Sequence, residues 1–322
     1  MKKLAITIGD PGGIGPEVVV KALPAISGEC LPIVIGDSAV LEDAVSRFGA
    51  SLKIQEIERV DEAFPSADSL WCIDPGSVRT FERGKPDEKN GAACVGYIRK
   101  AVELSMEKKV NGMVTAPISK EALKLAGFPW PGHTEMLAEL TGAREYAMML
   151  AGGPLKVILV TIHTALKNVP GLVTRERVLK TIRLAKKACD MFDIGRPVIA
   201  VSGLNPHAGE SGILGTEEMD EIVPAIEGAK EEGIVAQGPY PPDVIFRKAY
   251  KGEVDIVVCM YHDQGLIPLK MIAFDTGVNV TVGLPIIRTS PDHGTAYDIA
   301  WKGIADPSSM IEAIRMAIRL KL

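Results

Sequence analysis

The chain has five histidines, and all of them lie in polar, turn-like motifs rather than on apolar helical faces. Three of them, His163, His207 and His262, follow short apolar runs at residues 157–161, 198–201 and 255–260. Imidazole is the commonest metal ligand, and three protein ligands with open coordination positions make a catalytic metal site. Because the three are far apart along the chain, spacing does not show whether they converge. A metal site and three unrelated hydrogen-bonding histidines both stay open at this point.

Four further side chains could bind a small anionic molecule: Thr134, Lys270, Asn279 and Arg288. Arginine holds phosphate or carboxylate through two parallel hydrogen bonds, and lysine attracts them as a point charge. Threonine and asparagine can orient a ligand by hydrogen bonds. Taken singly, each is more simply interpreted as a solvated surface charge or a loop hydrogen bond.

A glycine-rich segment, Gly-Asp-Pro-Gly-Gly-Ile-Gly-Pro-Glu, occupies residues 9–17 between an apolar run and an amphipathic segment. Glycines at such a place let backbone N–H groups approach an anion at a helix N-terminus. The segment lacks both the GxGxxG spacing and the GK[ST] of a phosphate-binding loop. A tight strand-to-helix turn therefore explains it equally well.

The elements that must position these residues alternate along the chain. Short apolar runs are each followed by a Gly, Pro or polar turn and then by an amphipathic segment, as at residues 4–8, 32–35, 112–115 and 157–161. This pattern predicts an α/β fold with largely parallel strands. In such sheets ligands bind outside the carboxyl ends of the strands, where three of the histidines are expected.

Composition narrows the functional classes. The chain has 322 residues and a formal charge of −5, with no basic stripe, so nucleic acid is a poor partner. No apolar stretch approaches the roughly 20 residues that span a bilayer, so no membrane partner is expected. The first apolar run breaks at Gly9 without a cleavage site, which favours a strand over a signal peptide. The five cysteines lack CxxC spacing, which favours buried, reduced thiols in a cytoplasmic protein.

Two segments together resemble the isocitrate and isopropylmalate dehydrogenases: residues 9–17 and residues 293–307, which begin His-Gly-Thr-Ala-Tyr-Asp. The resemblance implies a two-lobed α/β fold with an active-site cleft between the lobes. It implies that NAD or NADP binds at His293, Gly294, Thr295, Ala296 and Asp298. That loop has no arginine or lysine for a 2′-phosphate, which slightly favours NAD. We expect residues 1–128 with 283–322 to form the cofactor lobe, and residues 129–282 the metal and dimerisation lobe.

Five segments, at residues 9–17, 131–135, 205–210, 261–265 and 283–290, resemble the 4-hydroxythreonine-4-phosphate dehydrogenase family, and the resemblance covers essentially the whole chain. It implies that His163, His207 and His262 bind one divalent metal ion, with zinc, cobalt, magnesium and manganese as candidates. It implies that His133, Thr134, Lys270, Asn279 and Arg288 contact the substrate. Asp243 and Asp263 also match, with roles left open.

The activity implied is the NAD(P)-dependent oxidation and decarboxylation of a phosphorylated hydroxy acid, with 4-hydroxythreonine 4-phosphate giving 3-amino-2-oxopropyl phosphate and CO₂. A catalytic group must take the hydroxyl proton and later reprotonate the product carbon. Lys270 is one candidate, and His133 or Asp243 is the other. The resemblance also implies two-lobed subunits that pair, with the active site at or near the subunit interface. We therefore expect a homodimer.

Two alternatives remain. The segments at residues 145–149, 155–158 and 298–301 resemble the relatives that oxidise 4-phospho-D-threonate or 4-phospho-D-erythronate to dihydroxyacetone phosphate and CO₂. The motifs do not separate these substrates, because the chemistry is common to them. A non-catalytic nucleotide- or metal-binding regulator on the same scaffold is the remote alternative.

Overall fold

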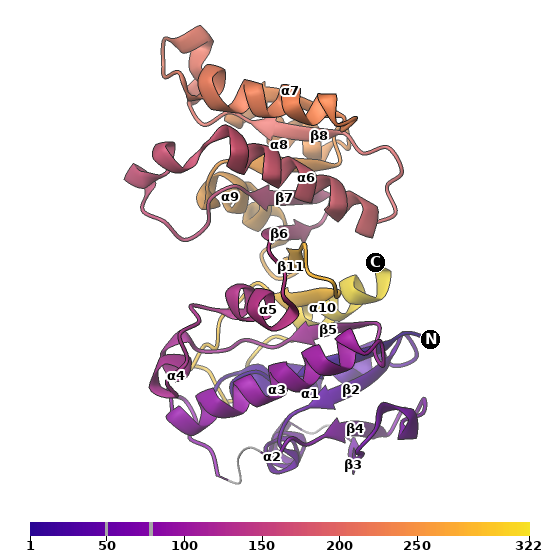
Figure 1. Cartoon of the computed structure of the whole chain (residues 1–322). Coiled ribbons are helices and arrows are strands. Elements are labelled where there is room, and N and C mark those ends of the chain that lie inside the picture. The colour runs from indigo at the N-terminus through magenta and orange to yellow at the C-terminus, as the bar shows by residue number, and fades with distance from the viewer. Residues whose placement is uncertain (49–50, 77–79) are drawn as a thin grey trace. The chain divides into compact units, whose positions relative to one another are not determined.

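The computed structural model describes residues 1–48, 51–76 and 80–322, in which strands and helices alternate (Figure 1). The chain forms two compact units, Met1–Arg144 with Leu284–Leu320 and Glu145–Gly283 with Lys321–Leu322. The boundary expected from the sequence, after residue 128, precedes helix α5 (His133–Thr141), whereas the observed boundary follows it. Helix α5 packs on α3 (Glu88–Met106), which explains why residues 129–144 belong with the first unit.

Six strands of the first unit form a sheet in the order β3, β4, β2, β1, β5, β12, and every neighbouring pair is parallel. The strands are β1 (Lys3–Thr7), β2 (Leu31–Ile35), β3 (Lys53–Glu56), β4 (Ser69–Ile73), β5 (Gly112–Thr115) and β12 (Arg288–Pro291). Its other helices are α1 (Gly15–Ala22), η1 (Leu23–Ile26), α2 (Ser38–Phe48), η2 (Val60–Glu62), α4 (Lys120–Leu125) and α10 (Ser308–Arg319). Because the strands are parallel, their carboxyl ends share one edge of the sheet.

The second unit has its six strands in the order β11, β6, β7, β10, β8, β9. The strands are β6 (Ala147–Gly152), β7 (Leu155–Leu159), β8 (Ile199–Ser202), β9 (Ala236–Tyr240), β10 (Ile256–Cys259) and β11 (Val278–Val282). The helices are η3 (Leu166–Asn168), η4 (Pro170–Leu172), α6 (Arg175–Met191), η5 (Pro206–Gly212), η6 (Glu218–Ile222), α7 (Val223–Glu231), α8 (Pro242–Tyr250) and α9 (His262–Ala273).

The predicted α/β fold with largely parallel strands is confirmed. Strand β6 is the exception, because it runs antiparallel to both β7 and β11. The two residues between β6 and β7 begin with Gly153 at a φ of +52°, a conformation that glycine adopts without steric cost. This tight turn reverses the chain, whereas the parallel pairs of the unit are joined by segments that contain helices.

The core of the second unit shows why strand β7 is mostly apolar. Alternate residues of β7, namely Leu155, Val157 and Leu159, pack into a cluster with Ile245 of α8 and Leu269 of α9. On the other face Ile158 is fully buried and Lys156 is partly buried, so both faces of the strand are largely covered. Such strands read as continuous apolar runs, which is the pattern by which the sequence predicted them.

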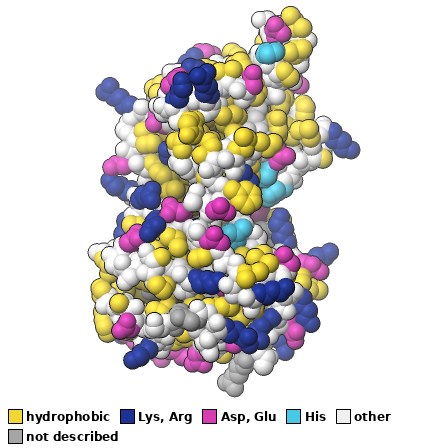
Figure 2. Space-filling view, turned by 180° about the vertical axis from the view of Figure 1, so that it is seen from behind, with side chains coloured by type: hydrophobic (Ala, Val, Ile, Leu, Met, Phe, Trp, Pro, Cys, Tyr) yellow, Lys and Arg dark blue, Asp and Glu magenta, His cyan; other side chains and the backbone are white. Residues whose placement is uncertain are grey.

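All five cysteines are free and buried, as predicted. Burial raises the pKa of Cys30 and of Cys189 to about 12, so both thiols stay protonated at neutral pH. Among the described residues, no helix is both long and apolar enough to cross a membrane. On the face drawn in Figure 2, Lys and Arg side chains are interspersed with Asp and Glu, as the composition led us to expect.

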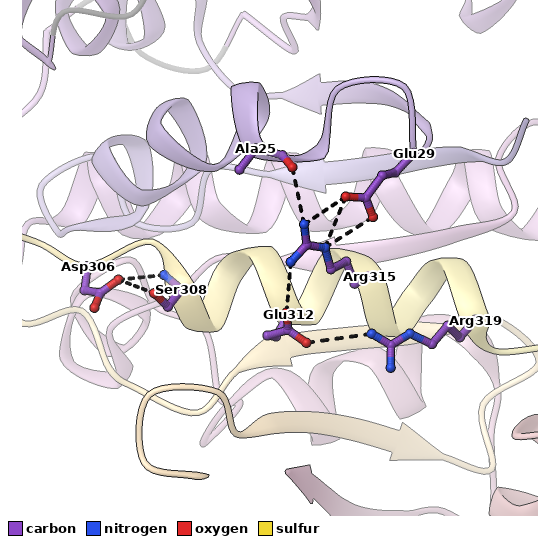
Figure 3. Close-up of polar contacts among 7 residues, drawn as sticks. All are labelled: Ala25, Glu29, Asp306, Ser308, Glu312, Arg315 and Arg319. Carbon is purple, nitrogen blue, oxygen red and sulfur yellow. Dashed lines mark hydrogen bonds and ion pairs between the residues drawn. The ribbon is translucent and has the colours of Figure 1, made fainter. Parts of the chain in front are cut away.

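The last helix, α10, is tied to the start of the first unit by Arg315 (Figure 3). Its guanidinium donates to Glu29 at 2.9 Å, to Glu312 at 3.2 Å and to the carbonyl of Ala25 at 3.4 Å. Arg315 is partly exposed, so each ion pair contributes only about 0–1 kcal/mol. The network therefore orients α10, while burial of its apolar residues against β12 and β5 supplies most of the stabilisation.

Candidate active site

Five side-chain atoms are buried without a hydrogen-bond partner in the described part of the chain: Thr7 Oγ1, Asn90 Oδ1, His133 Nε2, Asn279 Oδ1 and His293 Nε2. Buried polar atoms in folded proteins are nearly always satisfied, so each exception calls for an explanation. Three of the five belong to residues that the sequence predicted to bind substrate or cofactor. A ligand with polar groups fits such atoms, because it would supply the hydrogen bonds that the protein does not.

The residues of the first unit that the sequence predicted to contact the substrate are Arg288 on β12 and His133 and Thr134 on α5. Arg288 is only 2% exposed, and its Nε and Nη2 donate to Thr115 Oγ1 at 3.2 and 2.8 Å. Burial lowers the pKa of Arg288 to about 9, so the group still carries its charge at neutral pH. Burial, and then the charge of Arg288, lower the pKa of His133 well below its usual value. A buried cation beside a neutral imidazole suits an anionic ligand.

Thr134 follows His133 in the first turn of α5 and is partly buried. Thr115, which orients Arg288, was not singled out by the sequence. Thr7 and Asn90 were also missed, although both have an unpartnered buried atom. Thr7 and Thr115 end neighbouring strands, in register with each other. For these two threonines, the position at a strand end was the signal in the sequence that could have indicated a functional role.

The predicted cofactor residues follow β12 at the carboxyl edge of the first sheet. His293 Nδ1 lies 3.2 Å from the carbonyl oxygen of Gly294, and burial lowers the pKa of the ring. Gly294 and Asp298 are exposed, while Thr295 and Ala296 are partly buried. The loop thus presents exposed groups beside one buried ring nitrogen that lacks a partner, which fits a nucleotide with both polar and apolar faces.

The amino-terminal glycine segment holds this loop in place. Ile14 N–H donates to the carbonyl of Thr295 at 3.0 Å, and the hydroxyl of Tyr297 donates to the Asp10 carboxylate at 2.5 Å. The indole N–H of Trp301 donates to the carbonyl of Pro11 at 2.9 Å. Together these contacts join the turn after the first strand to the loop after the last one.

The same segment does not act as an anion cradle. The N–H groups of Gly12 and Gly13 donate to the side chain and carbonyl of Asp10, at 2.8 and 3.0 Å. The N–H of Ile14 is used by Thr295, as described above. Because these donors are already satisfied inside the chain, the structure favours the tight strand-to-helix turn over the phosphate-binding alternative.

An ion pair between Lys21 and the buried Glu17 extends the attachment. Glu17 is fully buried, accepts a hydrogen bond from Lys21 at 2.6 Å and another from the N–H of Ala305 at 2.9 Å. Lys21 donates to the carbonyls of Gly303 and Ala305 at 2.8 and 3.0 Å. Two non-glycine residues of the loop region, Ala296 and Trp301, have φ values of +42° and +62°. Such strained conformations persist only where the surroundings determine them, and these contacts do so.

In the second unit His163 and His262 lie together. They follow β7 and β10, which are neighbouring parallel strands, and their ring centroids are 5.6 Å apart. A pocket of about 360 Å³ is lined by both rings together with Ile162, Thr164, Leu166, Val169, Tyr261 and Asp263. His262 Nδ1 lies 2.7 Å from Asp263 Oδ1. When Nδ1 carries the proton and donates it to Asp263, Nε2 is the nitrogen that can bind a metal ion.

The structure does not bring His207 to the other two histidines. His207 lies exposed on η5, after β8, and within the described residues no three His, Cys, Asp or Glu side chains converge closely enough to hold a metal ion. Lys270 is on α9, with Nζ 5.8 Å from the centroid of the Phe274 ring. Asn279 is in β11, and Asp243 is exposed in the first turn of α8.

The fold places the chain among the α/β proteins in which parallel strands carry polar loops at their carboxyl ends. Residues 28–317 match the family described as pyridoxal phosphate biosynthetic protein PdxA, so the chain belongs to this family. It is 49% identical over 320 residues to a 4-hydroxythreonine-4-phosphate dehydrogenase of Desulfosudis oleivorans, covering 98% of this chain and 95% of the relative. The chain is thus a dehydrogenase, and the regulator alternative is set aside.

Two further comparisons agree on the family and differ in the substrate that they name. The crystal structure of 4-hydroxythreonine-4-phosphate dehydrogenase from Klebsiella pneumoniae is 41% identical, with a TM-score of 0.93 over 99% of this chain and 97% of that one. A relative from Oceanobacillus iheyensis, provisionally named D-threonate 4-phosphate dehydrogenase, is 45% identical, covering 98% of this chain and 97% of the relative.

We predict that two partly buried histidines, His133 and His293, make the protein less stable in mild acid. Folding lowers the pKa of His133 and His293, whereas the unfolded chain binds a proton at each near pH 6.5. Their stabilising contribution is therefore complete above about pH 6.5 and is lost as the pH falls, by up to about 1.4 kcal/mol per pH unit for each histidine. Urea denaturation at pH 7.5, 6.5 and 5.5 measures this slope. The His293→Gln variant should show a shallower slope, and an unchanged slope would contradict the assignment.

We predict that the hydroxyl of Tyr297 orders the loop at residues 293–303, which contains the predicted cofactor residues. Tyr297→Phe should destabilise the protein by about 1.5–3 kcal/mol and speed amide hydrogen exchange at residues 293–303, because Asp10 Oδ2 loses the donor that ties it to this loop. Tyr97→Phe is a matched control, since it removes a buried hydrogen bond from Tyr97 to Asp37 in the same unit. That control should lower stability without faster exchange in the loop. Equal exchange in both variants would show that Tyr297 does not order the loop.

Proposed function

We propose that this dehydrogenase uses NAD or NADP and one divalent metal ion to oxidise and decarboxylate a small phosphorylated hydroxy acid, with 4-hydroxythreonine 4-phosphate as its principal substrate. The products would be 3-amino-2-oxopropyl phosphate and CO₂. The family and the name of the 49% identical relative support the substrate. The free, buried thiols support action in the cytoplasm.

One observation carries the proposal. Of the five unpartnered buried polar atoms, three belong to His133, Asn279 and His293, which the motifs had already assigned to ligand binding. A structural role would pair such atoms inside the protein, because an unsatisfied buried group costs about 1–3 kcal/mol. A ligand-binding role explains both their residue types and their lack of partners.

The bound NAD or NADP would accept the hydride, and the metal ion would polarise the hydroxyl oxygen of the substrate. Arg288, held by Thr115, would bind the phosphate or carboxylate of the substrate as a buried cation. His133 is neutral and can accept or donate a hydrogen bond at Nε2. Lys270, His133 and Asp243 remain the candidates for moving the hydroxyl proton, and Asp243 is the most exposed of the three.

The proposed metal ligands are His163 and His262 from one subunit and His207 from the partner. The first two flank one pocket, and Asp263 can orient the ring of His262. His207 lies apart in the single chain, so a second copy must provide it if the site has three imidazoles. Helix α9 and the residue after it add a reason to expect a homodimer, because Ile267, Met271 and Phe274 are 59%, 83% and 73% exposed.

A second substrate class has its own support. The Oceanobacillus iheyensis relative is named for D-threonate 4-phosphate, and 4-phospho-D-erythronate belongs to the same class of sugar acid. Trp301, in a segment that resembles this branch, packs against Phe48 and Phe81 with ring centroids 5.8 and 5.2 Å away. We therefore keep 4-phospho-D-threonate and 4-phospho-D-erythronate as alternative substrates.

The proposal predicts metal-dependent NAD⁺ or NADP⁺ reduction with a phosphorylated hydroxy acid. Phosphorylated hydroxythreonine, threonate and erythronate should be compared side by side, with reduced cofactor followed by absorbance. Chelation should abolish the reaction, and added divalent metal should restore it, because the electrophile is removed and returned. Higher kcat/KM for threonate or erythronate would move the assignment to the alternative. Unchanged activity after complete metal removal would refute the metal-dependent mechanism.

The shared metal site predicts complementation between two inactive variants. His163→Ala and His207→Ala should each lose activity by at least about 10²-fold, since each removes one ligand. In a mixed dimer, one site keeps the wild-type His163 and the partner's wild-type His207, so some activity should return. Subunit exchange is confirmed with two differently tagged chains. No recovery after confirmed exchange would mean that each site is built within one chain.

A further inference from the structure

His207 begins a short stretch of left-handed backbone. Residues 207–211 have φ values of +52°, +53°, +79°, +46° and +58°, and only the third of them is glycine. For residues with a Cβ atom this conformation is unfavourable, because it brings Cβ too close to the following carbonyl oxygen. Runs of it are rare, and they persist only where the surrounding structure determines them. The strain therefore needs a structural cause close to the turn.

That cause is Glu218, a carboxylate that is only 2% exposed. Its Oε1 accepts hydrogen bonds from the backbone N–H groups of Leu204 and Asn205, at 2.8 and 2.7 Å. Its Oε2 accepts one from the side-chain amide of Asn205 at 2.9 Å. The carboxylate thus fixes the two residues that lead into the turn, and three donors offset the cost of burying its charge.

Close packing around the carboxylate leaves no room for a side chain at two glycine positions of the turn. A Cβ added to Gly209 would lie 2.7 Å from Glu218 Oε2, and one added to Gly215 would lie 2.4 Å from the amide nitrogen of Asn205. Both glycines also have positive φ values. The turn after Asn205 is therefore held from inside by Glu218, while His207 itself is exposed.

We propose that Glu218 is a positioning residue that locks the left-handed turn and so presents His207 in a preformed orientation for metal binding. This inference rests on the proposed metal site. A metal ligand that had to be ordered on binding would lose part of the binding free energy to conformational entropy. Because the buried carboxylate fixes the turn when the protein folds, this conformational entropy is lost on folding and not on metal binding.

The test is a titration of the metal-free full-length enzyme with Co²⁺, followed by its visible absorption, for wild type and Glu218→Gln. The glutamine can still accept from the two backbone donors, but its amide would meet the amide of Asn205 donor to donor. We expect Co²⁺ affinity to fall by about 10–100-fold, as for other residues that orient metal ligands. Amide hydrogen exchange at residues 205–212 should become faster in the variant without metal.

Glu221→Gln is the matched control. Glu221 lies in the same short helix, η6, and its carboxylate also accepts a backbone hydrogen bond, but from Arg175 at the start of α6. This variant should keep both the wild-type Co²⁺ affinity and slow exchange at residues 205–212. Asn205→Ser is a second variant, which withdraws the amide from Glu218 while leaving the carboxylate in place. It should weaken Co²⁺ binding in the same direction, and it serves if Glu218→Gln does not fold.

The outcomes separate this inference from the proposed function. Wild-type Co²⁺ affinity in Glu218→Gln or Asn205→Ser, with affinity lost in His207→Ala, would overturn the role of Glu218 and leave the metal site standing. Equal loss of affinity in Glu221→Gln would also overturn it, because the effect would then be general destabilisation. If the wild type binds no Co²⁺, the metal part of the proposed function fails, and the positioning role fails with it.

Discussion

The parallel pairing of strands is the constraint on which the rest of the structure depends. In the first unit every neighbouring pair is parallel, so the turns after β1, β5 and β12 share one edge of the sheet. In the second unit β7, β10 and β8 are neighbours and run the same way. His163, His262 and His207 each follow one of these three strands. His163 and His262 become neighbours because the strands that precede them end together, whereas the loop after β8 leaves His207 apart from both.

Buried polar groups are costly, and the protein treats them in two ways. Glu17 and Glu218 are almost fully buried, and each is surrounded by donors that hold a loop in place. His133, Asn279 and His293 have buried atoms that the described residues do not satisfy. The first kind stabilises loop conformations that would otherwise be strained. We propose that the second kind is left for a ligand, and folding stability is reduced by the cost of leaving these atoms unpaired.

The two ends of the chain depend on each other. The turn at residues 10–17 holds the loop at residues 295–305 through Asp10, Pro11, Ile14 and Glu17. Arg315 adds a link between α10 and the segment after α1. The glycine-rich segment is therefore a structural support for the predicted cofactor loop rather than a phosphate cradle. Residue types alone left both interpretations open, and the hydrogen bonds of the turn decide between them.

The sequence by itself determined the α/β class, the strand ends on which the polar motifs lie and the family. Apolar runs and turn residues are local signals, and the motifs keep their residues together along the chain. Only the tertiary structure decided that His163 and His262 meet while His207 stands apart, that Thr115 holds Arg288, and that Glu218 supports the turn at His207. These contacts join residues 13 to 173 positions apart, and whether such residues meet depends on strand order and loop conformation. The local sequence does not determine strand order or loop conformation, because both depend on how separate elements pack against one another.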